Sequence, residues 1–213
     1  VVLYKFLYTF TIIYTGVLTP NMSGSIITKQ KTQIQTQKKI RHHRYEDTKM
    51  KENYDVIIVG TGAAGLYCAL NLPERTNILM ITKQEADQSD SFLAQGGICM
   101  LRGEDDYDDY FEDTMRAGHY ENDKKAVDLM IRSSNSIIRD LLQRNVTFAR
   151  TPDGELDFTR EGAHSQPRIL FYEDITGKQI TQTLLEQART RDNIEICEYM
   201  TMVDLIADDN ICG

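Results

Sequence analysis

The residues with the clearest chemical use form the run Gly60-Thr61-Gly62-Ala63-Ala64-Gly65, whose pattern G-x-G-x-x-G can hold the pyrophosphate of a dinucleotide. Gly60 allows a tight turn, and Gly62 lacks the Cβ atom that would exclude the pyrophosphate. Gly65 lets a following helix pack close to a sheet, and the N-terminus of that helix supplies free N–H groups and a positive dipole. The pattern alone is a weak signal, so its surroundings must decide whether it is a nucleotide site.

The surroundings of this turn have the pattern of a strand–helix–strand unit. Residues 54–59 are a continuous apolar run, which is typical of a buried parallel strand. Apolar residues at helical spacing follow over 63–72 and end before Pro73, and residues 78–82 form a second apolar run. Together these segments predict a Rossmann-like α/β domain with the glycine turn at its first strand–helix junction.

The acid that usually accepts hydrogen bonds from the ribose at the end of the second strand is missing. Lys83 follows Ile81 and Thr82 there, and the nearest acid, Glu85, lies beyond the strand. A lysine can only donate hydrogen bonds, either to ribose oxygens or to a phosphate. The substitution argues against an enzyme that uses NAD alone, because such enzymes are expected to keep the acid.

Three further segments carry groups suited to a flavin or a small substrate. Residues 91–98 contain the sequence A-Q-G-G, in which adjacent glycines let the backbone lie flat against a planar ring. The second segment, residues 159–165, reads T-R-E-G-A-H-S, and the third, residues 168–177, contains Arg168-Ile169-Leu170 and Asp174-Ile175-Thr176-Gly177.

Three side chains in the last two segments are candidates for substrate binding. Glu161 can pair with an ammonium group through a charge-assisted hydrogen bond, although its position alone favours a surface carboxylate. His164 is either a catalytic group or, like most lone histidines, a structural one. Arg168 either clamps a substrate carboxylate or pairs with Asp174 as part of the scaffold.

The remaining chain predicts the elements that must position these groups. Apolar residues at helical spacing mark two long helices in the middle of the chain, and Asp123 is a candidate N-cap of the second. The turn sequence Pro152-Asp153-Gly154 begins a polar loop. The expected elements are helices over 107–117, 124–143 and 178–190, and strands over 194–197 and 202–207.

Charge and cysteine content exclude several classes of function. The chain has a net charge of −8, yet residues 1–49 are basic, so residues 50–213 are strongly acidic and a poor match for nucleic acid. The four cysteines are far apart and form no C-x-x-C pair, which argues against a zinc site or a dithiol redox motif. We therefore expect no metal, reduced thiols and a cytoplasmic protein.

Residues 1–49 differ in composition from the rest of the chain. Val1–Thr19 is an apolar run near the ~20 residues that span a bilayer, but it lacks the basic start and cleavage site of a secretory signal. We interpret residues 1–49 as a non-native or disordered upstream extension, with a membrane anchor as the less favoured alternative. Residues 50–213 are then the N-terminal part of the predicted domain.

In combination, the glycine turn and the three later segments resemble the succinate dehydrogenase/fumarate reductase flavoprotein superfamily. Within it, T-R-E-G-A-H-S and R-I-L resemble the L-aspartate oxidase family. The resemblance covers residues 53–213 and implies a Rossmann-like FAD-binding domain, truncated before the capping and C-terminal helical domains. In this superfamily a Ser/Thr-Lys pair normally replaces the acid missing at Lys83.

The resemblance implies that FAD contacts the glycine turn, Lys83 and the A-Q-G-G segment. The residues expected to contact FAD are Gly60, Thr61, Gly62, Ala63, Ala64, Gly65, Lys83, Asp90, Ser91, Phe92, Leu93, Ala94, Gln95, Gly96 and Gly97. Members of the superfamily in membrane complexes attach FAD covalently to a His at the position of Asp90. An aspartate cannot form that bond, so we expect FAD to be held non-covalently.

The reaction implied by the resemblance is the oxidation of L-aspartate to iminoaspartate, with O2 or fumarate as acceptor, at the start of NAD biosynthesis. The product would pass to quinolinate synthase. Glu161 matches the glutamate that orients the substrate ammonium group, and His164 and Arg168 are further candidates for this site. The family's catalytic arginine and other substrate ligands are expected beyond Gly213.

Two alternatives remain from the sequence. The first is a soluble fumarate reductase or succinate dehydrogenase flavoprotein subunit, against which Asp90 and T-R-E-G-A-H-S argue. The second is a non-catalytic FAD-binding fragment.

Overall fold

The computed structural model describes residues 13–14, 53–204, 207–208 and 211–212. The predicted strand–helix–strand unit is present as β2 (Val56–Val59), α2 (Ala63–Asn71) and β3 (Ile78–Ile81). β2 and β3 are parallel, with Val56 opposite Ile78. The glycine turn therefore lies at the carboxyl end of β2, where open parallel sheets bind ligands.

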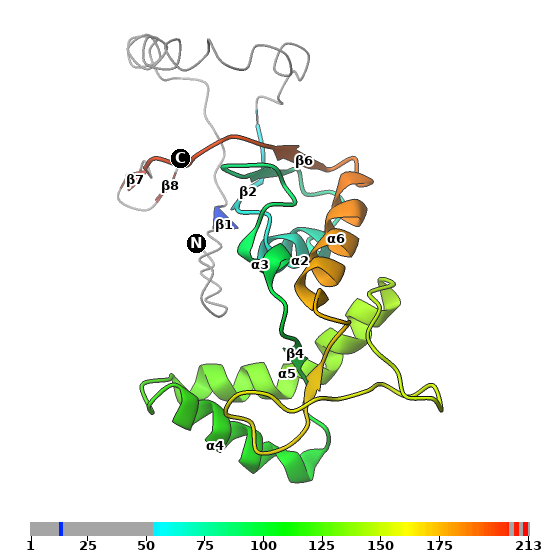
Figure 1. Cartoon of the computed structure of the whole chain (residues 1–213). Coiled ribbons are helices and arrows are strands. Elements are labelled where there is room, and N and C mark those ends of the chain that lie inside the picture. Colours follow the sequence, from blue (N-terminus) through cyan, green and yellow to red (C-terminus); the bar gives the residue numbers. More distant parts are fainter. Residues whose placement is uncertain (1–12, 15–52, 205–206, 209–210, 213) are drawn as a thin grey trace.

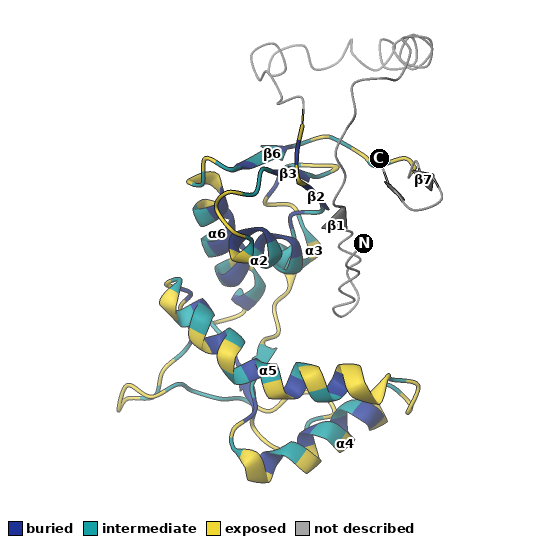
Figure 2. Cartoon of the chain, turned by 180° about the vertical axis from the view of Figure 1, so that it is seen from behind, coloured by how far each residue is buried: buried dark blue, intermediate teal, exposed yellow. Residues whose placement is uncertain are grey.

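Two more strands complete the sheet around this unit. β6 (Ile194–Cys197) adds parallel to β3, and the short β1 (Ile13–Tyr14) adds antiparallel to β2, so the strand order is β1-β2-β3-β6. α2 and α6 (Thr176–Arg189) pack together against the sheet (Figure 1). The main core between them is apolar and nearly solvent-free (Figure 2). Its strand and helix residues include Val56, Ile58, Ile78, Met80, Leu66, Ala69, Leu184 and Leu185.

A second unit of helices lies below the sheet in Figure 1. It consists of the 3-10 turn η1 (Glu104–Asp106), α4 (Tyr107–Ala117) and α5 (Lys124–Gln143). α4 and α5 share a small core of their own that contains Leu101, Tyr110, Met115, Val127 and Ile131. Their outer faces are exposed (Figure 2), so each helix is amphipathic, as the spacing of their apolar residues predicts.

The two units are joined by a two-stranded ribbon and by the end of α5. In the ribbon, β4 (Ile98–Cys99) pairs antiparallel with β5 (Ile169–Leu170). At the end of α5, Arg144 lies over the ring of Tyr67 of α2, and Gln187 of α6 donates a hydrogen bond of 2.6 Å to the carbonyl of Arg144. The helical unit is therefore fixed to both helices that cover the sheet.

Most of the elements predicted from the sequence are confirmed. The helices over 107–117 and 124–143 have the predicted bounds, and Asp123 accepts hydrogen bonds from the backbone N–H groups of Lys125 and Ala126, as an N-cap does. α6 begins at Thr176, two residues earlier than predicted.

Two predictions concern the ends of the chain and are not confirmed. The strand over 202–207 is wrong, because among the described residues of this range 202–204 lie in no strand, and Ala207 belongs instead to the hairpin of β7 (Ala207–Asp208) and β8 (Ile211–Cys212). The interpretation of residues 1–49 lies outside the described residues, apart from Ile13 and Tyr14. Within the described part of the chain, no helix is long and apolar enough to cross a membrane.

A substitution at Gly65 tests how closely α2 packs at the end of β2. A Cβ atom there would lie 2.3 Å from the carbonyl oxygen of Gly60, which is far inside van der Waals contact with rigid backbone. We expect Gly65→Ala to lower the free energy of unfolding by about 1–3 kcal/mol, despite the better helix propensity of alanine. Urea denaturation of the cofactor-free protein measures this. Gly96→Ala is the control, because no atom lies within 4 Å of its Cβ position. Equal stability of the two variants would contradict the close packing.

Candidate functional site

The glycine turn has the local geometry that a dinucleotide site needs. Gly60 has a φ of +105°, a conformation that side chains disfavour, and its N–H donates to the carbonyl of Ile81. Gly62 is the N-cap of α2 and supplies no side-chain cap, so the N–H groups of the first helical turn have no side-chain partner. Such N–H groups and the helix dipole favour an anion such as pyrophosphate.

Thr61 gives a second sign that this turn binds a polar ligand. The residue is 2% exposed, and its Oγ1 has no hydrogen-bond partner among the described residues. An unpartnered buried hydroxyl is costly, so a further polar group is expected next to the turn. With the uncapped N-terminus of α2 and the missing Cβ of Gly62, the turn fits the pyrophosphate of FAD.

A short helix that the sequence analysis did not predict lies directly against this turn. It is α3 (Asp90–Leu93), capped by Ser89, whose Oγ accepts a hydrogen bond of 3.2 Å from the N–H of Phe92. Ser91 Oγ would be 3.0 Å from a Cβ atom at Gly62. Gly62 and Ser91 therefore lie close enough together to contact the same ligand, which agrees with the prediction that both contact FAD. Asp90 and Lys83 are both exposed.

The A-Q-G-G segment is exposed on one side and held tightly at both ends. At its start, Gly177 of α6 donates a backbone hydrogen bond of 2.9 Å to the carbonyl of Ala94. At its end, a Cβ atom at Gly97 would lie 2.4 Å from the carbonyl oxygen of Leu170. Residues Leu93, Ala94, Gln95, Gly96 and Gly97 are all exposed. The backbone is thus fixed in place with a free face, as binding of a planar ring requires.

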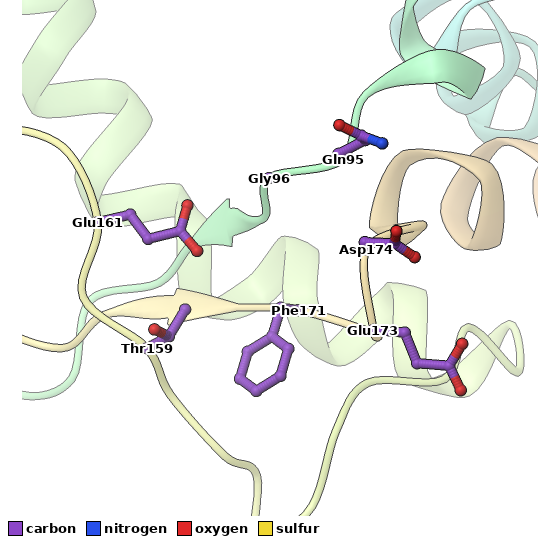
Figure 3. Close-up of a pocket in the computed structure, with 7 residues that line it drawn as sticks. All are labelled: Gln95, Gly96, Thr159, Glu161, Phe171, Glu173 and Asp174. Atoms are coloured by element: carbon purple, nitrogen blue, oxygen red, sulfur yellow. The ribbon is translucent and has the colours of Figure 1, made fainter.

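The A-Q-G-G segment and T-R-E-G-A-H-S meet across a cavity of about 360 Å³. The residues that line it are Gln95, Gly96, Thr159, Glu161, Phe171, Glu173 and Asp174. In Figure 3, Glu161 lies on one side and Asp174 on the other, with Gln95 and Gly96 along the edge between them, and the side chain of Glu161 points toward Gly96. Residues far apart in the sequence thus share one site.

The carboxylates on this cavity have no partners within the described part of the chain. Glu161, Glu173 and Asp174 are exposed, and their side chains form no hydrogen bond or ion pair there. Glu173 also has a φ of +48°, which is unusual for a residue with a side chain. The cavity is therefore electronegative and suited to a ligand that carries a positive group on that side.

Arg168 does not have the surroundings that the sequence suggested. Its side chain is fully buried and pairs with Asp106 and Asp113 at 2.6 and 2.7 Å. The prediction of a pair with Asp174 is wrong, and a direct clamp on substrate is incompatible with this burial. Because its guanidinium pairs with two buried carboxylates, Arg168 belongs to the scaffold.

His164 lies beside Arg168, and both of its ring nitrogens face protein groups. Arg168 is 3.0 Å from Nδ1, and because a guanidinium only donates, Nδ1 must accept. The neutral ring then carries its proton on Nε2, which lies 3.3 Å from Sγ of Cys99. Burial, and then the charge of Arg168, lower the pKa of His164. A catalytic role of His164 stays a prediction, and this geometry favours a structural one.

The two aspartates that hold Arg168 were missed by the sequence analysis. Asp106 and Asp113 are buried, although aspartate is rarely buried without a partner. A signal was present, since residues 106, 110 and 113 share one helix face and Tyr110 between them is apolar in character. As for metals, the described residues contain no cluster of His, Cys, Asp or Glu able to hold an ion.

Comparison with protein families matches the chain to FAD-binding proteins. The family described as FAD binding domain matches residues 55–213. The chain is 43% identical over 163 residues to L-aspartate oxidase of Clostridium perfringens, which covers 76% of this chain and 37% of that protein. It is 41% identical over 144 residues to L-aspartate oxidase of Synechocystis, which covers 67% of this chain and 26% of that protein. The chain thus spans between about a quarter and little more than a third of the length of these curated relatives.

Solved structures give the same picture of the fold. A quinol fumarate reductase of E. coli is 25% identical with a TM-score of 0.67, covering 72% of this chain and 27% of that one. Sdh1 of Mycobacterium smegmatis is 26% identical with a TM-score of 0.64, covering 72% and 28%. Both match the predicted superfamily.

Gly62→Val tests whether the glycine turn is the cofactor site. The branched side chain would occupy the space of the pyrophosphate, so we expect FAD binding to be lost while far-UV circular dichroism stays near that of the wild type. Gly62→Val combined with Ser91→Ala is the matched control. It removes the 3.0 Å contact within the protein, so recovery of flavin would show that only Ser91 was displaced. Unchanged flavin content of the single variant would place the cofactor elsewhere.

Proposed function

The chain belongs to the family of FAD-binding domains, and we propose that it forms the N-terminal part of an L-aspartate oxidase. In this proposal the FAD held at the glycine turn would supply the hydride acceptor: L-aspartate would lose a hydride from Cα and a proton from its ammonium group to give iminoaspartate, with O2 or fumarate as the final electron acceptor. The observation that carries the proposal is the position of Glu161, unpaired and facing Gly96 across the cavity.

The first task of the protein is to bind and orient the cofactor. The N-terminus of α2 and Gly62 would hold the pyrophosphate, and the hydroxyl of Thr61 would gain its missing partner next to it. The exposed backbone of Gln95 and Gly96 would lie against the flavin ring. Because Gly177 and Leu170 fix both ends of this segment, the ring would be placed by rigid backbone.

The second task is to select a substrate with an ammonium group. Glu161 would accept a charge-assisted hydrogen bond from the ammonium of aspartate. A dicarboxylate without that ammonium, such as succinate, would meet an unpaired carboxylate instead and be disfavoured. This argues against a succinate dehydrogenase, although the fold is shared with fumarate reductase.

The proposal also includes the pathway and the cellular location of the reaction. Iminoaspartate would be consumed by quinolinate synthase, which makes the reaction the first step of NAD biosynthesis. A cytoplasmic location agrees with Cys68 and Cys99, which are free thiols.

The cofactor should be held without a covalent bond. Asp90 occupies the position at which other members of the superfamily attach FAD to a histidine, and a carboxylate cannot make that linkage. We expect acid precipitation of the full-length enzyme to leave all yellow cofactor in the supernatant. Flavin that remains with the precipitated protein would contradict the argument from Asp90.

Glu161→Gln should impair aspartate oxidation in the full-length enzyme far more than fumarate reduction. The two compounds share both carboxylates, but only aspartate carries an ammonium group. Glutamine keeps the size of the side chain and removes its charge. A charge-assisted hydrogen bond is worth about 1.5–3 kcal/mol, so kcat/KM for aspartate should fall roughly 10- to 150-fold. Fumarate reduction should change by less than about threefold.

Glu173→Gln is the matched control, because it removes the same charge from the same cavity. In Figure 3 its side chain points away from Glu161, so we expect little change with aspartate. Equal losses in the two variants would mean that overall charge matters and that no specific contact forms. Equal losses of Glu161→Gln on both substrates would place Glu161 in the scaffold.

A further inference from the structure

We propose that Asp113 of α4 is a positioning residue that fixes the Glu161 loop, defined as residues 160–168, against the flavin cavity. The inference rests on the proposed function, since it assigns Asp113 a role through Glu161. Asp113 lies in the helical unit and was not among the residues expected to form the site.

The Glu161 loop depends on outside support for its shape. Its base is closed by a single bridge, in which Thr159 and Ile169 exchange two backbone hydrogen bonds of 2.9 and 3.1 Å. Between these residues the chain forms no helix or strand, and Gly162 has a φ of +57°. The backbone within the loop adds one contact of 3.3 Å, from the N–H of His164 to the carbonyl of Glu161.

Asp113 supplies the densest part of that support. Its Oδ2 accepts hydrogen bonds from the N–H of Ser165 at 2.6 Å, the Oγ of Ser165 at 2.7 Å and a guanidinium nitrogen of Arg168 at 2.7 Å. Its Oδ1 accepts from Arg116 at 2.5 Å, and Arg116 also donates to the carbonyl of Ala163 at 3.3 Å. Four donors from three residues therefore converge on one carboxylate that is 3% exposed.

The charge of Asp113 agrees with this role. Burial alone would raise its pKa, but the hydrogen bonds from Ser165 and Arg168 outweigh burial and lower the pKa to about 2. Asp113 therefore stays ionised at any pH at which the enzyme works. The tether is charge-assisted, and such bonds are the stronger kind.

Two further anchors, which precede α4 in the chain, act on the C-terminal end of the loop. Arg102 donates a hydrogen bond of 2.9 Å to the carbonyl of Pro167, and Asp106 accepts a hydrogen bond from the Arg168 guanidinium. Asp113 reaches the middle of the loop directly at Ser165, four residues from Glu161, and Arg116, which donates to Asp113, reaches it at Ala163. Because a misplacement of about 1 Å can cost roughly 100-fold in rate, a loose loop would weaken the contact of Glu161 with the substrate.

The test compares Asp113→Asn with Asp109→Asn in the full-length enzyme. Asn keeps the size of the side chain and loses its charge, while Asp109 is an exposed carboxylate on the same helix and serves as the control. We expect Asp113→Asn to lower kcat/KM for aspartate roughly 10- to 100-fold and to affect fumarate reduction and FAD content much less. Asp109→Asn should behave as the wild type.

A double-mutant cycle separates positioning from a general loss of structure. If Asp113 acts through Glu161, Asp113→Asn should reduce kcat/KM by less than about threefold when Glu161 is already Gln. Losses that multiply in the double variant, or equal losses on aspartate and fumarate, would overturn the inference.

Two further measurements keep the test decisive. Ser165→Ala removes one bond to Asp113 at an exposed residue, so it should fold and should lower kcat/KM for aspartate by a smaller factor in the same direction. Hydrogen exchange should become faster at residues 162–165 of Asp113→Asn and stay unchanged in α2. Hydrogen exchange is measured without aspartate, so the two proposals can fail separately. A wild-type enzyme that is inactive toward aspartate would contradict the proposed function, whereas unchanged exchange in Asp113→Asn would contradict the positioning role of Asp113.

Discussion

The burial of the Arg168 guanidinium between two aspartates is the interaction on which the geometry of the site depends. Its partners come from η1 and from α4, while Arg168 itself leads into β5. Taking three charges out of water is expensive, and their mutual attraction repays that cost only when the geometry is good and the hydrogen bonds are complete. Removal of one partner would leave an uncompensated buried charge, at a cost of about 3–5 kcal/mol. The network thus admits one arrangement of the ribbon, α4 and the Glu161 loop.

That arrangement places the Glu161 loop at one cavity with Gln95 and Gly96, which follow α3 in the chain. The glycine turn and α3 belong to the sheet side, and the Glu161 loop is tied to α4. The A-Q-G-G segment runs between them, held by Gly177 at one end and by the ribbon at the other. Backbone contacts as short as these tolerate no Cβ atom, which gives the glycines of two motifs a packing reason in addition to a chemical one.

The sequence predicted the parts of this fold that follow from local pattern. The strand–helix–strand unit, the bounds of α4 and α5 and the N-cap Asp123 are each visible in a short window of residues. α3 has only four residues, too few to show a period. The partner of Arg168 was predicted wrongly because Asp174 is near in sequence, whereas the true partners are 62 and 55 residues away. The strand over 202–207 failed for a related reason, since apolar residues form a strand only where another strand offers hydrogen bonds.

The site uses its carboxylates in two opposite ways, and the difference explains the selectivity that we propose. Asp106 and Asp113 are buried and paired with groups of the protein itself, so they hold structure and are not available to a ligand. Glu161 is exposed to the cavity and forms no hydrogen bond or ion pair within the described part of the chain. Apart from the exposed Arg160, the arginine nearest to it in sequence is Arg168, whose guanidinium is already paired with Asp113 and Asp106. A ligand that contacts Glu161 is then bound more favourably when it brings its own positive charge to pair with the carboxylate. Among four-carbon dicarboxylates, an amino acid such as aspartate meets that condition, and succinate does not.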